Sequence, residues 1–395
     1  MAENPQNIIR SWNLQTSFAT GPVVTDKLVP PPYGRIRTNF VQTWRTQALS
    51  NVDWGVQNFS IYLPESLRVV SAIYLKLEVP ANGAASYKAY PGLYAIRSMR
   101  LLSGGQEVYT CDRYSDFLSD YYQSLDERQL KYFADCYLGG QTAAGSARTL
   151  LLPMLIPNSA YLNRNGYDTR GHGVMPCFLG QNRLEVQIVM NPASYVSTAE
   201  NVPGSISGVC SMLMHQVDMT AADVLRYSDL RGSYSLINRR FTELSSGWTA
   251  ASANTPVIFS HQQPVGCVTE VFIQAVATGT EDPIKVVTTM IHPTKFKVTA
   301  DSVTQKDLNT PQKIGMELYS NGFTRNGDFN NCARLCFASH AAESAHHYSG
   351  GYNMQLASTV QFEFEFGANV DYRLFAVQLQ RVSIDSLGLI RASLE

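Results

Sequence analysis

The sequence predicts an all-β protein made of two tandem jelly-roll β-sandwiches, with a short helical insertion in the first sandwich. Three observations lead to this prediction: short runs of alternating apolar and polar residues, one segment with helical spacing, and a weak internal repeat of the strand order. Of the 395 residues, 45% are hydrophobic and only 16% are charged, which excludes a disordered chain. The formal net charge of −1 argues against a protein that coats nucleic acid along its whole length.

Residues 1–37 are predicted to form an N-terminal arm. They lack the apolar run of a secretory signal, and three successive prolines at 30–32 favour an extended chain. No stretch of the sequence is apolar enough to cross a bilayer as a helix. The arm residues that could contact a partner are Arg10, Trp12, Lys27, Arg35 and Arg37. Because these residues are sparse, docking on a neighbouring subunit is favoured over binding to lipid headgroups or nucleic acid.

From residue 38 onward, period-2 alternation dominates, in short runs separated by Gly, Pro, Asn and Ser. In Ile73–Val79 every second residue is apolar, while Lys76 and Glu78 point to the other face. The segments Leu184–Ile188 and Val360–Phe366 alternate in the same way. This pattern is typical of antiparallel strands with one buried face.

One segment of the first half has helical spacing instead. Its apolar residues recur three and four positions apart, at Tyr114, Phe117, Leu118, Tyr121, Tyr122 and Leu125. A further short helical turn is predicted to end at Gly139-Gly140. We therefore expect a mostly β protein with one helical insertion, placed in its first half.

The internal repeat predicts a duplicated sandwich. The strands at 184–188 and 209–219 have counterparts at 360–366 and 375–385, and the boundary falls near 228–238. The pair of strands at 96–101 and 107–109 is matched with 284–289 and 296–298 in the second half. The predicted domains are therefore a first jelly roll at 38–230 and a second jelly roll at 231–395, each with about eight strands.

A group of cysteine and histidine residues resembles a metal site in composition. Its members are Cys332, Cys336, His340, His346 and His347. Since residues 333–339 have the composition of a strand, Cys332 and His340 would lie about 26 Å apart, too far for one ion. We predict no metal or cofactor here, and we expect the seven scattered cysteines to be free thiols in a reducing compartment.

Catalytic motifs are also not apparent. The sequence has no Gly-x-Ser-x-Gly motif, and Ser103-Gly104-Gly105-Gln106 fits a hairpin turn better than a phosphate-binding loop. Glu363 and Glu365 share one strand face about 6.6 Å apart, which suits a glycosidase but is more often the polar side of a strand. We predict that the protein is not an enzyme.

A run of motifs in the first half has a specific resemblance. Asn58–Pro64 ends in Leu-Pro, a second strand ends at Pro80, and Ile96–Tyr109 contains a Gly-Gly hairpin that leads through an acidic turn to the helix. This order resembles the first jelly roll of the double jelly-roll major capsid proteins of tailless icosahedral phages and large eukaryotic DNA viruses. The resemblance covers the whole chain in architecture but only residues 58–125 in motif.

The resemblance implies a structural role in a virion, reached by assembly in the host cytoplasm. Three chains would form a pseudo-hexagonal capsomer that tiles an icosahedral shell, with the long loops of residues 110–180 outward. The implied partners are other copies of the chain, minor capsid and penton proteins and, through the arm, an internal viral membrane, without sequence-specific binding of nucleic acid. Two alternatives stay open: a double-sandwich hydrolase similar to peptide:N-glycosidase, and a carbohydrate- or receptor-binding β-sandwich protein.

Overall fold

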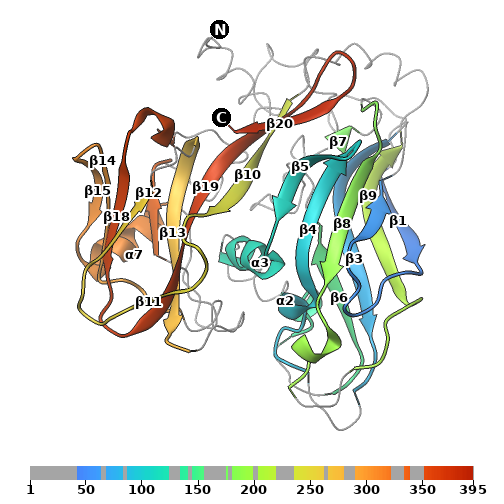
Figure 1. Ribbon diagram of the computed structural model, residues 1–395. Coiled ribbons are helices and arrows are strands. Elements are labelled where there is room, and N and C mark those ends of the chain that lie inside the picture. Colours follow the sequence, from blue (N-terminus) through green and yellow to red (C-terminus); the bar gives the residue numbers. More distant parts are fainter. Residues whose placement is uncertain are drawn as a thin grey trace. The chain divides into compact units, whose positions relative to one another are not determined.

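The computed structural model describes residues 42–63, 68–82, 87–123, 134–140, 145–154, 175–176, 180–198, 203–218, 235–261, 266–279, 290–321, 333–338 and 351–394 (Figure 1). The predicted arm lies outside these ranges. The chain divides into two compact units: unit 1 is mainly residues up to 238 together with 381–393, and unit 2 is mainly residues 239–380. The predicted domain ranges remain predictions, because strands β10 and β19 each divide between the two units.

Unit 1 contains two antiparallel sheets. The first has the order β1 (Gln42–Leu49), β9 (Cys210–Asp218), β3 (Arg68–Val79) and β6 (Arg148–Pro153), with β7 (Met175–Pro176) paired to β3. The second has the order β2 (Phe59–Tyr62), β8 (Leu184–Met190), β4 (Ile96–Ser103) and β5 (Gln106–Cys111). The chain passes back and forth between the sheets, as the strands of a jelly roll do.

Unit 2 repeats the same order. One sheet runs β10 (Ser235–Glu243), β19 (Val370–Ile384), β13 (Cys267–Ala277) and β16 (Ala333–Cys336), and the other runs β12 (Val257–His261), β18 (Val360–Glu365), β14 (Lys295–Ala300) and β15 (Val303–Leu308). Three short strands extend the first sheet: β11 (Thr249–Ala251), β17 (Tyr352–Asn353) and β20 (Ile390–Leu394). The predicted all-β fold with two tandem jelly rolls is confirmed.

The predicted alternation is also confirmed. In β3 the residues Ile73, Leu75, Leu77 and Val79 are buried, and the residues between them are partly exposed. Strands β8 and β18 alternate in the same way. Each of these strands therefore turns one face to a sandwich core and one face outward.

The predicted repeat is wrong by one strand in its middle part. Strand β14 occupies the position in unit 2 that β4 occupies in unit 1, so Phe296–Val298 corresponds to β4 and not to residues 107–109. The counterpart of β5 is β15, and residues 284–289 lie outside the described residues. The mismatch arises because alternating strands look alike in sequence, and only pairing partners distinguish them.

The corresponding hairpins of the two units have the same turn geometry. Gly104 and Gly105 join β4 to β5 with φ of 56° and 81°, which confirms the predicted hairpin. Asp301 and Ser302 join β14 to β15 with φ of 46° and 66°. Positive φ at both central residues matches a type I′ turn. In unit 2 the Asp301 carboxylate accepts the backbone N–H groups of Ser358 and Thr359 at 2.9 and 3.0 Å, which fixes the strained turn.

Among the described residues, a helix of ten residues follows the outer hairpin of each jelly roll, after β5 and after β15. Helix α3 (Tyr114–Gln123) confirms the predicted insertion, with Tyr114, Phe117 and Leu118 buried. Helix α7 (Pro311–Ser320) lies between β15 and β16, so the prediction of a helix in the first half alone is wrong. The sequence signal for α7 is weak, because a glycine interrupts a helix with only two buried residues, Ile314 and Leu318.

Three shorter helical turns complete the described elements: α2 (Gly92–Ala95), η3 (Ala193–Tyr195) and η6 (Met354–Leu356). Gly139 and Gly140 have φ of 87° and 73°, in agreement with the predicted stop after a short helical turn. Cys111, Cys136, Cys210, Cys267 and Cys336 are free thiols, while the other two cysteines lie outside the described residues. Within the described part of the chain, none of the helices has the length and apolar character to cross a bilayer.

Candidate functional site

The five arm residues predicted to bind a partner, Arg10, Trp12, Lys27, Arg35 and Arg37, lie outside the described residues. Their role stays a prediction. Unit 2 contains two polar clusters that involve buried side chains. One is a charged and aromatic layer on the sheet that contains β13, and the other is a set of polar contacts that holds α7.

Strand β13 is buried on both of its faces. Val271, Ile273 and Ala275 belong to the sandwich core of unit 2. Glu270 and Phe272 point to the opposite face, yet their exposed fractions are only 0% and 1%. A strand with two buried faces has few positions for polar side chains, so each one that it carries needs a partner.

A stacked row crosses three strands on this second face. Arg334 of β16, Phe272 of β13 and Phe375 of β19 are direct cross-strand neighbours. The rings of Phe272 and Phe375 stack with 4.9 Å between centroids and 13° between planes. The Arg334 guanidinium lies 4.7 Å from the centre of the Phe272 ring. Cation–π attraction is strengthened here because water is excluded.

Two ion pairs are in contact with this row, one of them formed by Arg334 itself. Arg334 Nη1 lies 3.1 Å from Glu270 Oε1, and both side chains are fully buried. Arg373 binds Glu243 through two hydrogen bonds, from Nε at 2.9 Å and from Nη2 at 2.8 Å. The Arg373 guanidinium also stacks 4.6 Å from the centre of the Phe375 ring. Such pairs add little net stability when intact, but losing one partner leaves a buried charge at a cost of about 3–5 kcal/mol.

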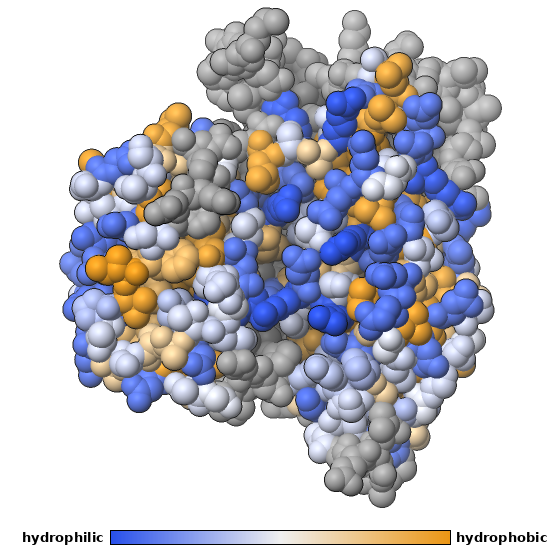
Figure 2. Space-filling model, in the orientation of Figure 1, coloured by the Kyte–Doolittle hydropathy of each residue, from blue (hydrophilic) through white to orange (hydrophobic). Residues whose placement is uncertain are grey.

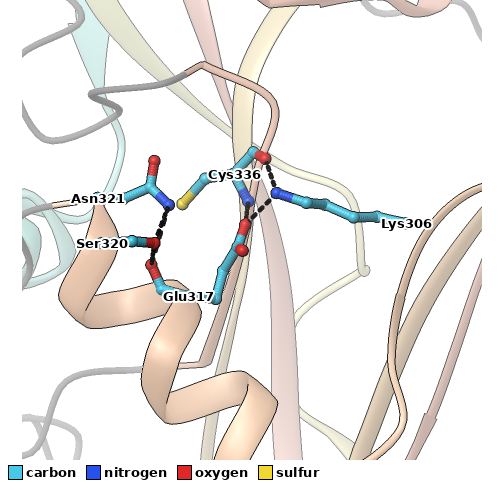
Figure 3. Close-up of polar contacts among 5 residues, drawn as sticks. All are labelled: Lys306, Glu317, Ser320, Asn321 and Cys336. Carbon is cyan, nitrogen blue, oxygen red and sulfur yellow. Dashed lines mark hydrogen bonds and ion pairs between the residues drawn. The ribbon is translucent and has the colours of Figure 1, made fainter.

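Helix α7 is held on β16 by the polar contacts that Figure 3 shows. The Glu317 carboxylate accepts the backbone N–H of Cys336 at 3.0 Å and forms an ion pair with Lys306, whose ammonium also donates to the Cys336 carbonyl. At the end of the helix, Asn321 Nδ2 donates to the Glu317 carbonyl at 2.9 Å. With Ile314 buried below, these contacts fix the orientation of the helix.

The structure places Cys336 at the end of β16, so the predicted strand over residues 333–339 is found for 333–336 and ends before 337–338. Burial raises the pKa of the Cys336 thiol well above its usual value, and the nearby Glu270 and Glu317 raise it further. The thiol is therefore protonated at neutral pH, the form that is a poor nucleophile. The other cysteine and histidine residues considered as metal ligands lie outside the described residues: Cys332, His340, His346 and His347.

The two carboxylates that suit a glycosidase have separate partners. Glu365 of β18 pairs with Lys295 of β14 at 2.6 Å, and Glu363 pairs with Lys297 at 3.6 Å. Each pair joins directly opposed residues of neighbouring strands. The carboxylates thus belong to an alternating row of charges on the polar side of the sheet, as the sequence predicted.

Sequence reasoning missed the buried charges of unit 2. The available signal was the composition of Cys267–Ala277, which is nearly continuous in apolar residues and contrasts with the regular alternation of β3. A nearly continuous apolar run indicates a strand buried on both faces. Within such a strand, Glu270 calls for a buried cationic partner, although the sequence does not indicate which arginine supplies it.

Comparison with known proteins supports the fold assignment. The fold is that of the double jelly-roll major capsid proteins, although no family model and no curated protein matches the sequence. A chain of the PBCV-1 virus capsid superposes with a TM-score of 0.64 at 11% identity, covering 92% of this chain and 98% of that one. The Faustovirus major capsid protein gives a TM-score of 0.62 at 8% identity, with 89% and 92% covered. The mavirus major capsid protein gives 0.53 at 10% identity, with 97% and 94% covered.

Proposed function

We propose that this chain is a viral major capsid protein, with a structural and not an enzymatic role. The observation that carries the proposal is the duplicated strand order: two sheets of one jelly roll recur, strand for strand, in a second jelly roll of the same chain. The similarity over nearly the whole length of several viral capsid proteins supports it. A jelly roll offers flat lateral faces and variable end loops, which suits a building block that meets many neighbours.

The proposed assembly unit is a homotrimer. Three chains with two similar sandwiches each would give six sandwiches around one axis, a pseudo-hexagonal block that can tile an icosahedral shell. The near-zero formal charge fits this role, because copies would not repel one another strongly. The chain would then be located in the virion, after assembly in the host cytoplasm.

The N-terminal arm is proposed to serve assembly as well. Arg10, Trp12, Lys27, Arg35 and Arg37 would contact a neighbouring trimer or, in a virion with an internal membrane, its anionic headgroups. Minor capsid and penton proteins would bind the same shell. No sequence-specific contact with nucleic acid is expected from so sparse a set of basic residues.

The alternatives predicted from the sequence receive less support. A hydrolase similar to peptide:N-glycosidase needs paired acids in a cleft, whereas Glu363 and Glu365 each face a lysine on a sheet surface. A carbohydrate-binding protein would present clustered aromatic side chains. In the described residues the most exposed tyrosines, Tyr62, Tyr195 and Tyr319, come from β2, η3 and α7.

The mass of the native protein in solution tests the proposal. Light scattering at low and moderate salt should give about three times 43.8 kDa, and the trimer should resist dilution. A monomer at every concentration would contradict a capsomer, and assays of glycan cleavage and glycan binding would then separate the two alternatives. The same purified protein serves both experiments.

A further inference from the structure

Helix α7 of unit 2 has one exposed side, which we call the α7 patch. Its members lie three and four positions apart and are therefore neighbours on the helix surface: Gln312, Gly315, Met316 and Tyr319. Met316 and Tyr319 have exposed fractions of 72% and 84%. In Figure 2, apolar side chains reach the surface over the area where Figure 1 draws α7 and β15. None of the four residues is charged, so a partner would be recognised by its apolar and hydrogen-bonding groups.

Gly315 lies in the middle of this patch, although packing within the chain does not require a glycine there. A Cβ atom at this position would meet nothing within 4 Å apart from its own helix backbone. A glycine inside an exposed helix destabilises the helix relative to alanine, so it is unfavourable unless the missing side chain serves a purpose. Its absence leaves a notch at the helix backbone, with Gln312 and Tyr319 one turn away on either side. Such a notch lets the backbone of another chain approach closely.

The α7 patch is held in one orientation before any partner binds. The Glu317 carboxylate accepts the backbone N–H of Cys336 at 3.0 Å and pairs with Lys306. Ile314 and Leu318 of the same helix are buried. A surface that is already ordered loses little freedom on binding, so even a short segment can dock on it.

The N-terminal arm contains a segment whose chemistry fits this surface. The three prolines at 30–32 favour an extended polyproline helix, which has no internal hydrogen bonds. Because they carry no backbone N–H groups, they cannot supply the donors that pairing with a sheet edge requires, so they bind by their side. Polyproline segments dock on aromatic surfaces, where proline rings pack on aromatic rings and side-chain donors reach the carbonyl groups. Tyr319 and Gln312 offer both kinds of contact.

The other exposed tyrosines of the described residues fit less well. The Arg183 guanidinium lies 5.2 Å from the centre of the Tyr62 ring, so one face of that ring is already covered. Tyr195 is 52% exposed but belongs to the three-residue turn η3, in which Ala193 is buried. Neither tyrosine lies on a helix beside an exposed glycine, and the α7 patch is therefore the better site for the prolines.

We propose that the prolines at 30–32 of one copy of this chain dock on the α7 patch of a second copy. The proline rings pack on Met316 and Tyr319, and the extended backbone enters the notch at Gly315. The inference rests on the proposed self-assembly and names the surface that receives the arm. Residues 33–41 join the prolines to β1 and span about 30 Å when extended, which allows the arm to reach a neighbouring copy. A contact from the arm of one chain to unit 2 of the next is head to tail and is compatible with a closed ring of three.

A photo-crosslinking side chain at position 319 tests which segment docks there. In the full-length protein with Tyr319→p-benzoylphenylalanine, light should link position 319 to residues 29–33, as identified by mass spectrometry of the digested product. When isotope-labelled and unlabelled chains are mixed, the links should join labelled to unlabelled copies. Links to another segment, or links within one copy only, would overturn the proposal.

The variant Gly315→Leu separates docking from folding. Leucine favours a helix more than glycine does and has open space at this position, so resistance to urea should be unchanged or higher in the dissociated protein. Leucine also fills the notch, so self-association should weaken at least about tenfold, measured by light scattering over a concentration series. Tyr319→Ala, and alanine in place of all three prolines at 30–32, should weaken it to a similar extent. Tyr195→Ala is the matched control and should associate like the wild type.

The outcomes distinguish this inference from the proposed function. Unchanged association in Gly315→Leu and Tyr319→Ala would overturn the α7 patch as the docking site, as would equal weakening in Tyr195→Ala. Unchanged association without the three prolines would overturn the arm as the occupant. If the wild-type protein is monomeric at every concentration, the proposed capsid function fails. If the wild type associates and these variants associate equally well, only this inference fails.

Discussion

Strands β3 and β13 hold the same position in the two jelly rolls but have different surroundings. In β3 one face is buried and the other carries Lys76 and Glu78, which pair with each other at the surface. In β13 the second face is buried too, and Glu270 pairs with Arg334 out of contact with water. The comparison shows that strand order fixes one buried face only, while the environment of the second face is set separately in each copy.

The largest expected effect comes from breaking the buried pair. Arg334→Ala removes the buried cation that pairs with Glu270 and stacks over Phe272, so it should destabilise the protein by about 3–5 kcal/mol in urea unfolding. In the corresponding strand of unit 1, Lys76→Ala should cost less than about 1 kcal/mol, because its pair is solvated.

A double variant sharpens this prediction. Replacing both partners, as Glu270→Leu with Arg334→Met, removes both charges and should recover most of the loss. If Arg334→Ala costs no more than Lys76→Ala, the second face of β13 is not the water-free environment described above.

The contacts of α7 should have an intermediate effect. Glu317→Ala removes the acceptor of the Cys336 N–H and the partner of Lys306, at a cost of about 1.5–3 kcal/mol in thermal or urea unfolding. Glu365→Ala removes an exposed ion pair with Lys295 and is the control, with a cost under about 1 kcal/mol. Equal losses would show that Glu317 is no better shielded from solvent than Glu365.

The two type I′ turns offer a smaller effect of opposite sign. Ser302→Gly relieves a positive φ of 66° and should stabilise the protein by up to about 1 kcal/mol. Gly105→Ser imposes the same strain on the hairpin of unit 1 and should destabilise it by a similar amount. Both changes are measured as shifts of the urea midpoint, and a shift of the same sign in the two variants would contradict equivalent turn geometry.

The smallest effect concerns pH. Hydrogen bonds from Lys76 and Thr149 lower the pKa of Glu78 below its usual value. A lowered pKa means that this carboxylate stabilises the fold above its usual pKa near 4.5, and that the contribution disappears as the pH falls through the lowered value. The stability difference between wild type and Glu78→Gln should therefore be small at pH 7 and vanish in acid. A difference that grows in acid would contradict this sign.

The regular strands could be predicted because each has one solvent-exposed face, so that apolar and polar residues alternate along its sequence. Strands such as β8 and β18 show this period throughout. The partner of the buried Glu270 could not be predicted, since Arg334 in a strand is expected to point outward until its surroundings are known. Helix α7 was missed because Gly315 and a short apolar face hide its spacing. The shift of the repeat by one strand has the same origin: alternation identifies a strand but not its neighbours.

The paired hairpin turns also bear on ancestry. One copy reaches a left-handed backbone with two glycines, and the other reaches it with an aspartate that is tied to a neighbouring loop by two hydrogen bonds. The two units of one polypeptide thus reach the same backbone geometry with different residues. Relatives of this chain are expected to keep the geometry of this turn while its residues differ. Comparison of backbone structures should therefore detect such relatives when their sequences are no longer recognisably similar.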